Sequence, residues 1–229
     1  MEWVSVFTEN FEEFVVTIKK FAPKFLPGVR NTLLLTLFSI LLGCLIGLLV
    51  SVIKLSRKKF LNKLMNIYIS IIRGTPLLLQ LYFIYNGLPG LGIKIDPFPS
   101  AVIGLALHNG AYISEIFRGA IESIDYGQRE AARSLGMTKW QAMKRIILPQ
   151  AFKRSIPSLG NQFIISVKDS SLASVITITE TMLLAKQYVA ATYNVFPIYF
   201  IAGAYYLIIT MLLTKGLRRI ELKLKVNER

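Results

Sequence analysis

Five stretches of roughly 20 mostly apolar residues run through this chain, and they restrict its fold more than any other feature. A helix needs about 20 such residues to cross the hydrocarbon core of a bilayer. The stretches cover approximately residues 32–53, 64–85, 101–121, 156–178 and 198–217. Charged residues make up only 17% of the 229, against about 25% in ordinary soluble domains. The sequence therefore predicts a single transmembrane domain, an all-α integral membrane protein with five transmembrane helices.

The distribution of basic residues predicts the orientation of these spans. The formal net charge is +14, which would also suit a nucleic-acid-binding protein. The Lys and Arg residues, however, lie between the apolar stretches rather than on a polar domain. They concentrate after the first span, between the third and fourth, and after the fifth, and an excess of this kind marks cytoplasmic loops. We therefore expect the N-terminus outside, the C-terminus in the cytoplasm, and a lipid bilayer rather than nucleic acid as partner.

Residues 1–27 precede the first span as an amphipathic segment. Aromatic and aliphatic residues recur there at three- and four-residue steps, as on one face of a helix. They are Phe7, Phe11, Phe14, Ile18, Phe21 and Phe25. Such a helix suits either the outer membrane interface or a position packed against the bundle. Pro23 and Pro27 are expected to end it before the first span.

The most specific pattern lies in residues 122–155, the basic loop between the third and fourth spans. It reads Glu130-Ala131-Ala132, three residues, Gly136, nine residues, Ile146, one residue, and Leu148-Pro149. Gly136 suits a helix end that needs a left-handed residue, Thr138 can cap a following helix, and Pro149 is expected to stop it. The pattern predicts two short helices joined at a glycine, which would form a cytoplasmic docking surface for another protein. A solvated basic loop is the alternative.

This pattern resembles the EAA loop of ATP-binding-cassette importer permeases, and the resemblance extends from about Asn31 to Leu217. Four further segments resemble the polar amino acid branch, the histidine, glutamine and arginine permeases: residues 73–77, 111–119, 127–128 and 168–172. Ser170 stands where that branch usually has Thr, and the hydroxyl is kept. The resemblance implies that the loop couples the chain to an ATPase. The coupling residues would be Glu130, Ala131, Ala132, Gly136, Leu148 and Pro149.

The same resemblance implies the remaining partners and the location. These are a second permease subunit, identical or homologous, two ATP-binding-cassette ATPase subunits that bind ATP and Mg, and an extracytoplasmic amino-acid-binding protein, all at a bacterial-type plasma (inner) membrane. The residues agree, because the chain has no Gly-x-x-x-x-Gly-Lys-Ser/Thr phosphate loop. We therefore expect no cofactor and no catalytic residue in this chain. Five spans cannot form two equal halves, so a two-fold dimer is expected to supply the symmetry.

Polar residues within the spans are candidates for the substrate pathway, because a charge at the bilayer centre costs about 2.5–3.5 kcal/mol on insertion scales. Helical spacing places the candidates of the third span on one face, and likewise those of the fourth. The Arg-Gly-Thr-Pro sequence should break the second span and leave backbone groups free to bind a zwitterion. The candidate substrate-binding residues are Arg73, Gly74, Thr75, His108, Tyr112, Glu115, Gln162, Ser166 and Asp169.

Several of these residues have a purely structural alternative. Arg73 could brace the bundle, His108 could be a packed hydrogen-bonding residue, and Glu115 could pair with Arg118 three residues later. A free Glu115 would favour a basic amino acid (arginine, lysine or histidine); glutamine or another polar amino acid is the alternative. An integral-membrane enzyme is a remote alternative, because one histidine, one apolar-embedded Cys44 and no metal-ligand cluster offer little chemistry. A passive channel would need a pore-lining ring and no docking loop.

Overall fold

The computed structural model describes residues 2–56 and 58–226, with the side chains of 11–56 and 58–224. Within these residues the chain is helical almost throughout and contains no strand. In chain order the elements are α1 (Glu2–Phe21), the 3-10 turn η1 (Ala22–Phe25), α2 (Leu26–Leu55), α3 (Lys59–Gly74), α4 (Leu77–Tyr82), the π turn η2 (Phe83–Gly87), η3 (Leu88–Leu91), α5 (Pro97–Glu122), α6 (Tyr126–Ser134), α7 (Lys139–Ala142), the π turn η4 (Met143–Ile147), α8 (Leu148–Asp169), η5 (Ser170–Ile176), α9 (Thr181–Thr192) and α10 (Val195–Val226).

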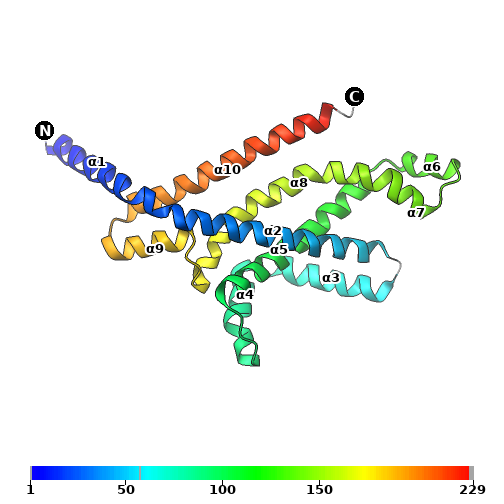
Figure 1. Cartoon of the computed structure of the whole chain (residues 1–229), viewed down its shortest axis with the longest axis horizontal. Helices are drawn as coiled ribbons and strands as arrows, with labels where there is room; N and C mark the ends of the chain where they lie inside the picture. The colour runs from blue at the N-terminus through cyan, green and yellow to red at the C-terminus, as the bar shows by residue number, and fades with distance from the viewer. Residues whose placement is uncertain (1, 57, 227–229) are drawn as a thin grey trace.

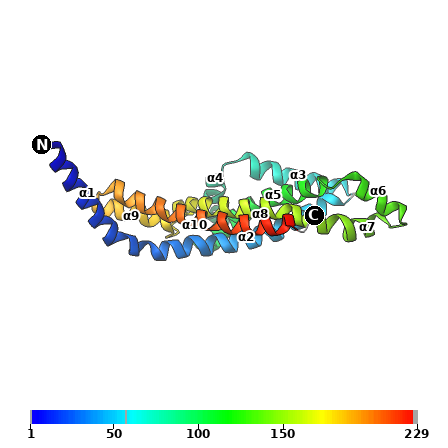
Figure 2. The ribbon, with the colours of Figure 1, turned by 90° about the horizontal axis from the view of Figure 1, so that it is seen from above.

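The long helices α2, α5, α8 and α10 extend along one axis of a flat, elongated molecule (Figure 1). The loop formed by α6 and α7 lies at one end of this axis, together with the C-terminal end of α2. The N-terminus and α9 lie at the opposite end, and the view from above agrees (Figure 2). Residues 11–55 and 195–224 are each long and apolar enough to cross a membrane, and the bent α3–α4 pair is a third candidate span. The helical membrane fold is confirmed, whereas the number of five spans stays a prediction.

The N-terminal segment packs on the bundle, which is one of its two expected placements. The Phe25 side chain is fully buried, and its ring lies 5.4 Å from that of Tyr188 on α9. The Phe14 ring lies 5.4 Å from that of Phe200 on α10. Helix α1 ends at Phe21, just before Pro23, as expected, but no loop separates it from the first span, because η1 and α2 follow directly. Both prolines occupy the first turn of a new helical element, where a missing N–H costs no hydrogen bond. Phe7 lies outside the described side chains.

A close contact between α2 and α5 forms the centre of the bundle. A Cβ atom added to Gly47 would lie 2.6 Å from the Ile113 side chain, and one added to Gly110 would lie 2.6 Å from Ile46. Gly43 and Gly47 are four residues apart, the spacing that lets two membrane helices approach closely. This packing leaves the opposite side of α2 exposed and apolar.

The predicted break in the second span is confirmed. Helix α3 ends at Gly74, Pro76 precedes α4, and the two helical segments meet at an angle of 107°. The side chain of Gln80 bridges the break, because its Nε2 atom donates hydrogen bonds to the backbone oxygens of Ile72 (2.8 Å) and Thr75 (3.1 Å). A proline without an N–H and a glycine without a Cβ make the break, and one glutamine holds its two sides together.

The helix in the region of the predicted fourth span, 156–178, differs in outline from that prediction. Its helix, α8, begins earlier and ends at Asp169, and a 3-10 segment continues to Ile176. The following helix, α9, is preceded by the fully buried Glu180, whose carboxylate accepts hydrogen bonds from the N–H groups of Met182 and Leu183. Tyr206 of α10 donates a third bond of 2.7 Å to the same carboxylate. Glu180 therefore caps α9 and ties it to α10.

Candidate functional site

The loop between α5 and α8 folds as two short helices around a left-handed glycine, as predicted. Gly136 has a φ of 76° and follows the C-terminal end of α6. Thr138 accepts a hydrogen bond from the N–H of Gln141, whose side chain accepts one from the N–H of Thr138. This reciprocal pair satisfies two otherwise unpaired backbone donors at the start of α7. The α6–α7 loop thus has a defined shape of its own.

The expectation that Pro149 stops the second short helix was wrong. Helix α7 continues through the π turn η4 into α8, so Pro149 lies in the first turn of α8. In the π turn the N–H of Leu148 donates to the oxygen of Met143, five residues earlier. A local widening of this kind lets a helix accommodate a residue that cannot donate a hydrogen bond. The loop is consequently continuous with α8.

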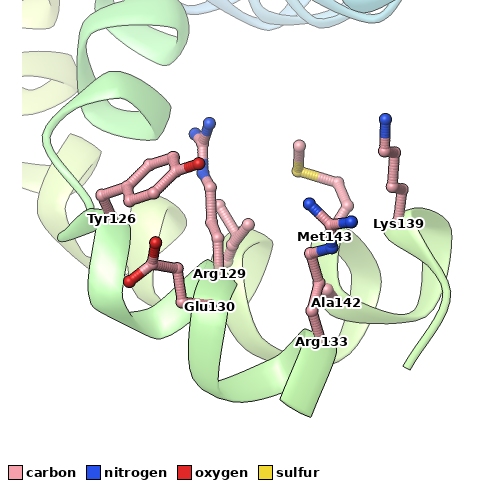
Figure 3. Close-up of a pocket in the computed structure, with 8 residues that line it drawn as sticks. Tyr126, Arg129, Glu130, Arg133, Lys139, Ala142 and Met143 are labelled. Atoms are coloured by element: carbon pink, nitrogen blue, oxygen red, sulfur yellow. The ribbon is translucent and has the colours of Figure 1, made fainter. Parts of the chain in front are cut away.

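The α6–α7 loop presents large apolar side chains to solvent. Leu135 is 78% exposed and Trp140 70% exposed. A pocket of about 340 Å³ separates α6 from the start of α7. It is lined by Tyr126, Arg129, Glu130, Arg133, Lys139, Ala142, Met143 and Ile147. Figure 3 shows Tyr126 and Glu130 of α6 on one side of this pocket, and Met143 and Lys139 on the other, with Arg133 of α6 drawn beside Ala142. Exposed apolar and cationic side chains around a hollow suit contact with another protein.

Other residues of the predicted coupling pattern divide between surface and interior. Glu130, Ala131, Leu148 and Pro149 are exposed, whereas Ala132 is buried. A buried apolar cluster joins the loop to the spans. It contains Ala120 and Ile121 of α5, Ile124, Ile147 of η4 and Ala151 of α8. The loop is therefore packed against α5 and α8 together.

At the break after α3, the structure brings together several of the predicted pathway residues. The Arg73 guanidinium carbon lies 5.1 Å from the centre of the Tyr112 ring, a cation–π contact. The His108 ring lies 4.9 Å from the same Tyr112 ring. Thr75 donates a hydrogen bond to the oxygen of Ile71, while Gly74 is exposed with open space around it. These residues form a polar surface, the Arg73–Tyr112 surface, on one side of the chain.

Glu115 is not free, which contradicts the basis of the preference for basic substrates. Its carboxylate accepts a hydrogen bond of 2.9 Å from Lys54 of α2 and one of 2.7 Å from Arg118. Arg73 approaches it to 4.0 Å, and Arg118 also pairs with Glu122 at 2.6 Å. The alternative of a structural Glu115–Arg118 pair therefore fits the structure. Lys54 contributes because α2 packs along α5 and places its last turn beside Glu115.

Gln162 and Ser166 face the interior of the chain rather than an open pathway. Gln162 donates a hydrogen bond of 2.9 Å to the side-chain oxygen of Asn109, and Asn109 donates one of 2.9 Å to the hydroxyl of Ser166. All three side chains are buried between α5 and α8. Membrane helices satisfy buried polar groups in this way, across their interface. Asp169, on the same predicted face, lies at the end of α8 and stays half-buried.

Sequence reasoning missed three residues that organise these contacts: Asn109, Glu180 and Lys54. Asn109 adjoins His108 in an apolar span, so its polar side chain was a usable signal. Glu180 was detectable as an acidic residue directly before a helical pattern. Lys54 looked like an ordinary cytoplasmic lysine, and only the packing of α2 on α5 shows its partner.

Comparison with known proteins places the chain in a family. The model of the binding-protein-dependent transport system inner membrane component matches residues 39–225. The glutamine transport system permease protein GlnP of Escherichia coli (strain K12) is 42% identical over 167 residues, covering 72% of this chain and 76% of the relative. The arginine transport system permease protein ArtQ of Bacillus subtilis (strain 168) is 40% identical over 217 residues, covering 94% of this chain and 99% of the relative.

A solved structure agrees with these similarities. The fold matches a crystal structure described as an amino acid ABC transporter with histidines, with a TM-score of 0.88 and 41% identity over 91% of this chain and 97% of the other. The resemblance inferred from the EAA pattern is thus confirmed. The chain belongs to the family of binding-protein-dependent transport system inner membrane components, in its branch of amino acid ABC importer permeases.

Proposed function

We propose that this chain pairs with a second permease subunit to form the translocation pathway of an importer for a polar amino acid. Two ATP-binding-cassette ATPases would bind ATP and Mg and drive it, and an extracytoplasmic binding protein would deliver the substrate. As a transport subunit of this family, the chain is not an enzyme, and ATP hydrolysis belongs to a separate subunit. The observation that carries the proposal is the α6–α7 loop, with its exposed Leu135 and Trp140 and its packed connection to α5 and α8.

The proposed coupling follows from that connection. The ATPase would contact the α6–α7 loop, and closure of the ATPases on ATP would push the loop as one body. The buried cluster around Ile124 and Ile147 would pass this movement to α5 and α8, which carry the polar membrane residues. Glu130, Ala131, Ala132, Gly136, Leu148 and Pro149 keep the coupling role that the family pattern implies, with Ala132 supporting the loop from inside.

The proposed assembly is a two-fold dimer, whether of identical or homologous chains. Arg73 and Lys168 are exposed on the single chain although they lie within membrane-spanning segments. Such cations would be costly against lipid. A second subunit that encloses a water-filled pathway would remove this cost. The orientation follows the basic residues: the α6–α7 loop and the C-terminus in the cytoplasm of a bacterial-type inner membrane, and the N-terminus outside.

The proposed substrate is a polar amino acid bound near the Arg73–Tyr112 surface. Arg73 suits its carboxylate, and Gly74 and Thr75, at the break beside Arg73, are proposed to lie next to it. Two relatives, at 42% and 40% identity, are named as glutamine and arginine transport permeases, respectively. Glu115 is paired with Lys54 and Arg118, so the structure provides no support there for a basic preference. His108, Tyr112 and Asp169 are proposed as pathway residues, and Gln162 and Ser166 as supports of the α5–α8 contact.

The experiment that tests this function combines retention of the ATPase with transport. The double variant Leu135→Ala/Trp140→Ala should retain the partner ATPase at least about tenfold less well during purification, because two exposed apolar contacts are lost. Tyr193→Ala is the matched control, since Tyr193 is 86% exposed and lies before α10 at the far end of the molecule. Reconstituted vesicles should take up a radiolabelled polar amino acid only when ATP is present on the side of the membrane where the ATPase subunits lie. Unchanged retention and uptake in the double variant would contradict the coupling role.

A further inference from the structure

Helix α3 carries a continuous polar face along its whole length. Each residue of an α-helix turns the chain by about 100°, and at this rotation all members of the face lie within one third of the helix circumference. Its members are Lys59, Asn62, Lys63, Asn66, Ser70 and Arg73. The remaining positions between them are apolar, apart from Tyr68, whose hydroxyl donates a hydrogen bond of 2.7 Å to the oxygen of Leu107. We call these six residues the α3 polar face.

The α3 polar face is open in the single chain. Lys59, Lys63, Asn66 and Ser70 are all exposed. A shallow hollow runs along the face, lined by Lys59, Asn62, Lys63, Asn66, Ile67, Ser70 and Ile71. The side of α3 that faces the bundle is different: Ile69 is buried there. Asn62 is half-buried and Arg73 lies over Tyr112 of α5, but no described helix covers the stretch of the face from Lys59 to Ser70 that the exposed residues form.

The face is also strongly cationic. It carries three basic residues and no acidic one. In the described part of the chain, Arg73 approaches Glu115 only to 4.0 Å, while Lys59 and Lys63 take part in no ion pair. Glu115 is already held by Lys54 and Arg118. The positive charge of the face is therefore largely uncompensated.

The length of the α3 polar face along the helix axis excludes lipid as the surroundings of all its residues. Each helical residue advances about 1.5 Å, so Ser70 lies about 16 Å from Lys59 and Arg73 about 21 Å. Lys59 and Lys63 could extend to the aqueous interface from the end of the helix. Asn66, Ser70 and Arg73 lie too deep to do so and require water or protein beside them.

Charge argues against the same face of a second copy as the cover. A two-fold contact places like residues opposite one another, so Lys63 would meet Lys63 without a counter-charge. With lipid and the same face of a second copy excluded, we take water, and the substrate that passes through it, as the surroundings of the face. Resting on the proposed function, the geometry points to the α3 polar face as the wall of the cytoplasmic half of the translocation path, where Lys59 and Lys63 attract the carboxylate of the departing amino acid.

The test measures the reactivity of single cysteines in the assembled transporter with its ATPases. The background variant Cys44→Ser removes the free thiol. Asn66→Cys and Ser70→Cys report on the polar face, and Leu64→Cys is the control. Leu64 is 41% exposed in the single chain and lies about 160° from Asn66 around the helix. The probes are two methanethiosulfonates of similar size, the anionic sulfonatoethyl and the cationic trimethylammonioethyl reagent.

We expect Asn66→Cys and Ser70→Cys to react at least about tenfold faster than Leu64→Cys. The anionic reagent should react faster at Asn66→Cys than the cationic one, relative to their rates with a small thiol. Adding Lys63→Gln should lower this anion preference by about threefold, as expected for one charge at close range in a partly aqueous path. Equal rates at positions 64 and 66 would overturn the water-lined wall. So would a slow Asn66→Cys that instead forms a disulfide with a second copy.

An anion preference that Lys63→Gln leaves unchanged would overturn the role of the charge.

The outcomes of the labelling experiment can be distinguished from failure of the proposed function. A transporter that couples ATP hydrolysis to uptake but leaves Asn66→Cys unreactive refutes only the wall. A chain that retains no ATPase refutes the proposed coupling, whatever its labelling pattern.

Discussion

The α6–α7 loop and the polar centre of the membrane region obtain their structures in different ways. In the loop, residues close together in the chain satisfy one another: Thr138 and Gln141 pair across three residues, and Gly136 makes the turn itself. In the membrane region, the partners are remote. Asn109 joins Gln162, 53 residues away, and Lys54 joins Glu115, 61 residues away.

This difference explains which sequence signals were informative. A cap or a left-handed glycine can be recognised because its partners lie within one helical turn. A polar residue in a span signals only that some partner exists. Whether that partner is a substrate or another helix depends on packing across long sequence distances.

The close α2–α5 contact should be the most sensitive point. Gly47→Leu would place a side chain where even a Cβ lies 2.6 Å from Ile113, and overpacking should destabilise the subunit by about 2–3 kcal/mol. The measurement is thermal unfolding of the purified complex in detergent. Gly203→Leu is the control, because nothing lies within 4 Å of a Cβ at Gly203 on α10. Equal stability of the two variants would contradict the packing described here.

The Asn109 network should respond next most strongly. Asn109→Leu leaves the Gln162 amide and the Ser166 hydroxyl without their buried partner, which should cost about 2 kcal/mol. The triple variant Asn109→Leu/Gln162→Leu/Ser166→Ala should recover most of the loss, because no unpaired group remains. Both are read from the same unfolding curves. If Asn109→Leu loses transport but no stability, the network acts on substrate rather than on packing.

The loop should respond through coupling rather than through stability. Gly136→Val forces a β-branched residue into a left-handed conformation at a cost of about 1–2 kcal/mol. A cost of about 1.4 kcal/mol corresponds to tenfold in the population of the docked conformation. Transport and transport-linked ATP hydrolysis should fall accordingly while membrane insertion is retained. Gly136→Asn is the control, since Asn tolerates this conformation. Normal transport by Gly136→Val would refute the docking role.

Glu115→Gln should have the smallest effect on stability, below about 1 kcal/mol, because the ion pairs are only partly buried. Since Lys54 and Arg118 hold this carboxylate, uptake of cationic and neutral amino acids should change by the same factor. Competition assays with arginine and glutamine measure this. A selective loss for arginine would restore Glu115 as the site that receives a basic side chain.

The membrane class, the break after Arg73 and the two-helix loop could be predicted from the residues alone, and the family from the resemblance of the EAA pattern. Each depends on composition or on residues a few positions apart, where the chain geometry leaves few alternatives. The packing of the helices was needed to show that Gln162 and Ser166 face Asn109 and that Glu115 is paired with Lys54. It also showed that no loop interrupts the chain at Pro23, Pro27 or Pro149. The physical reason is that a buried polar group must find a partner, and its identity depends on which helices pack together.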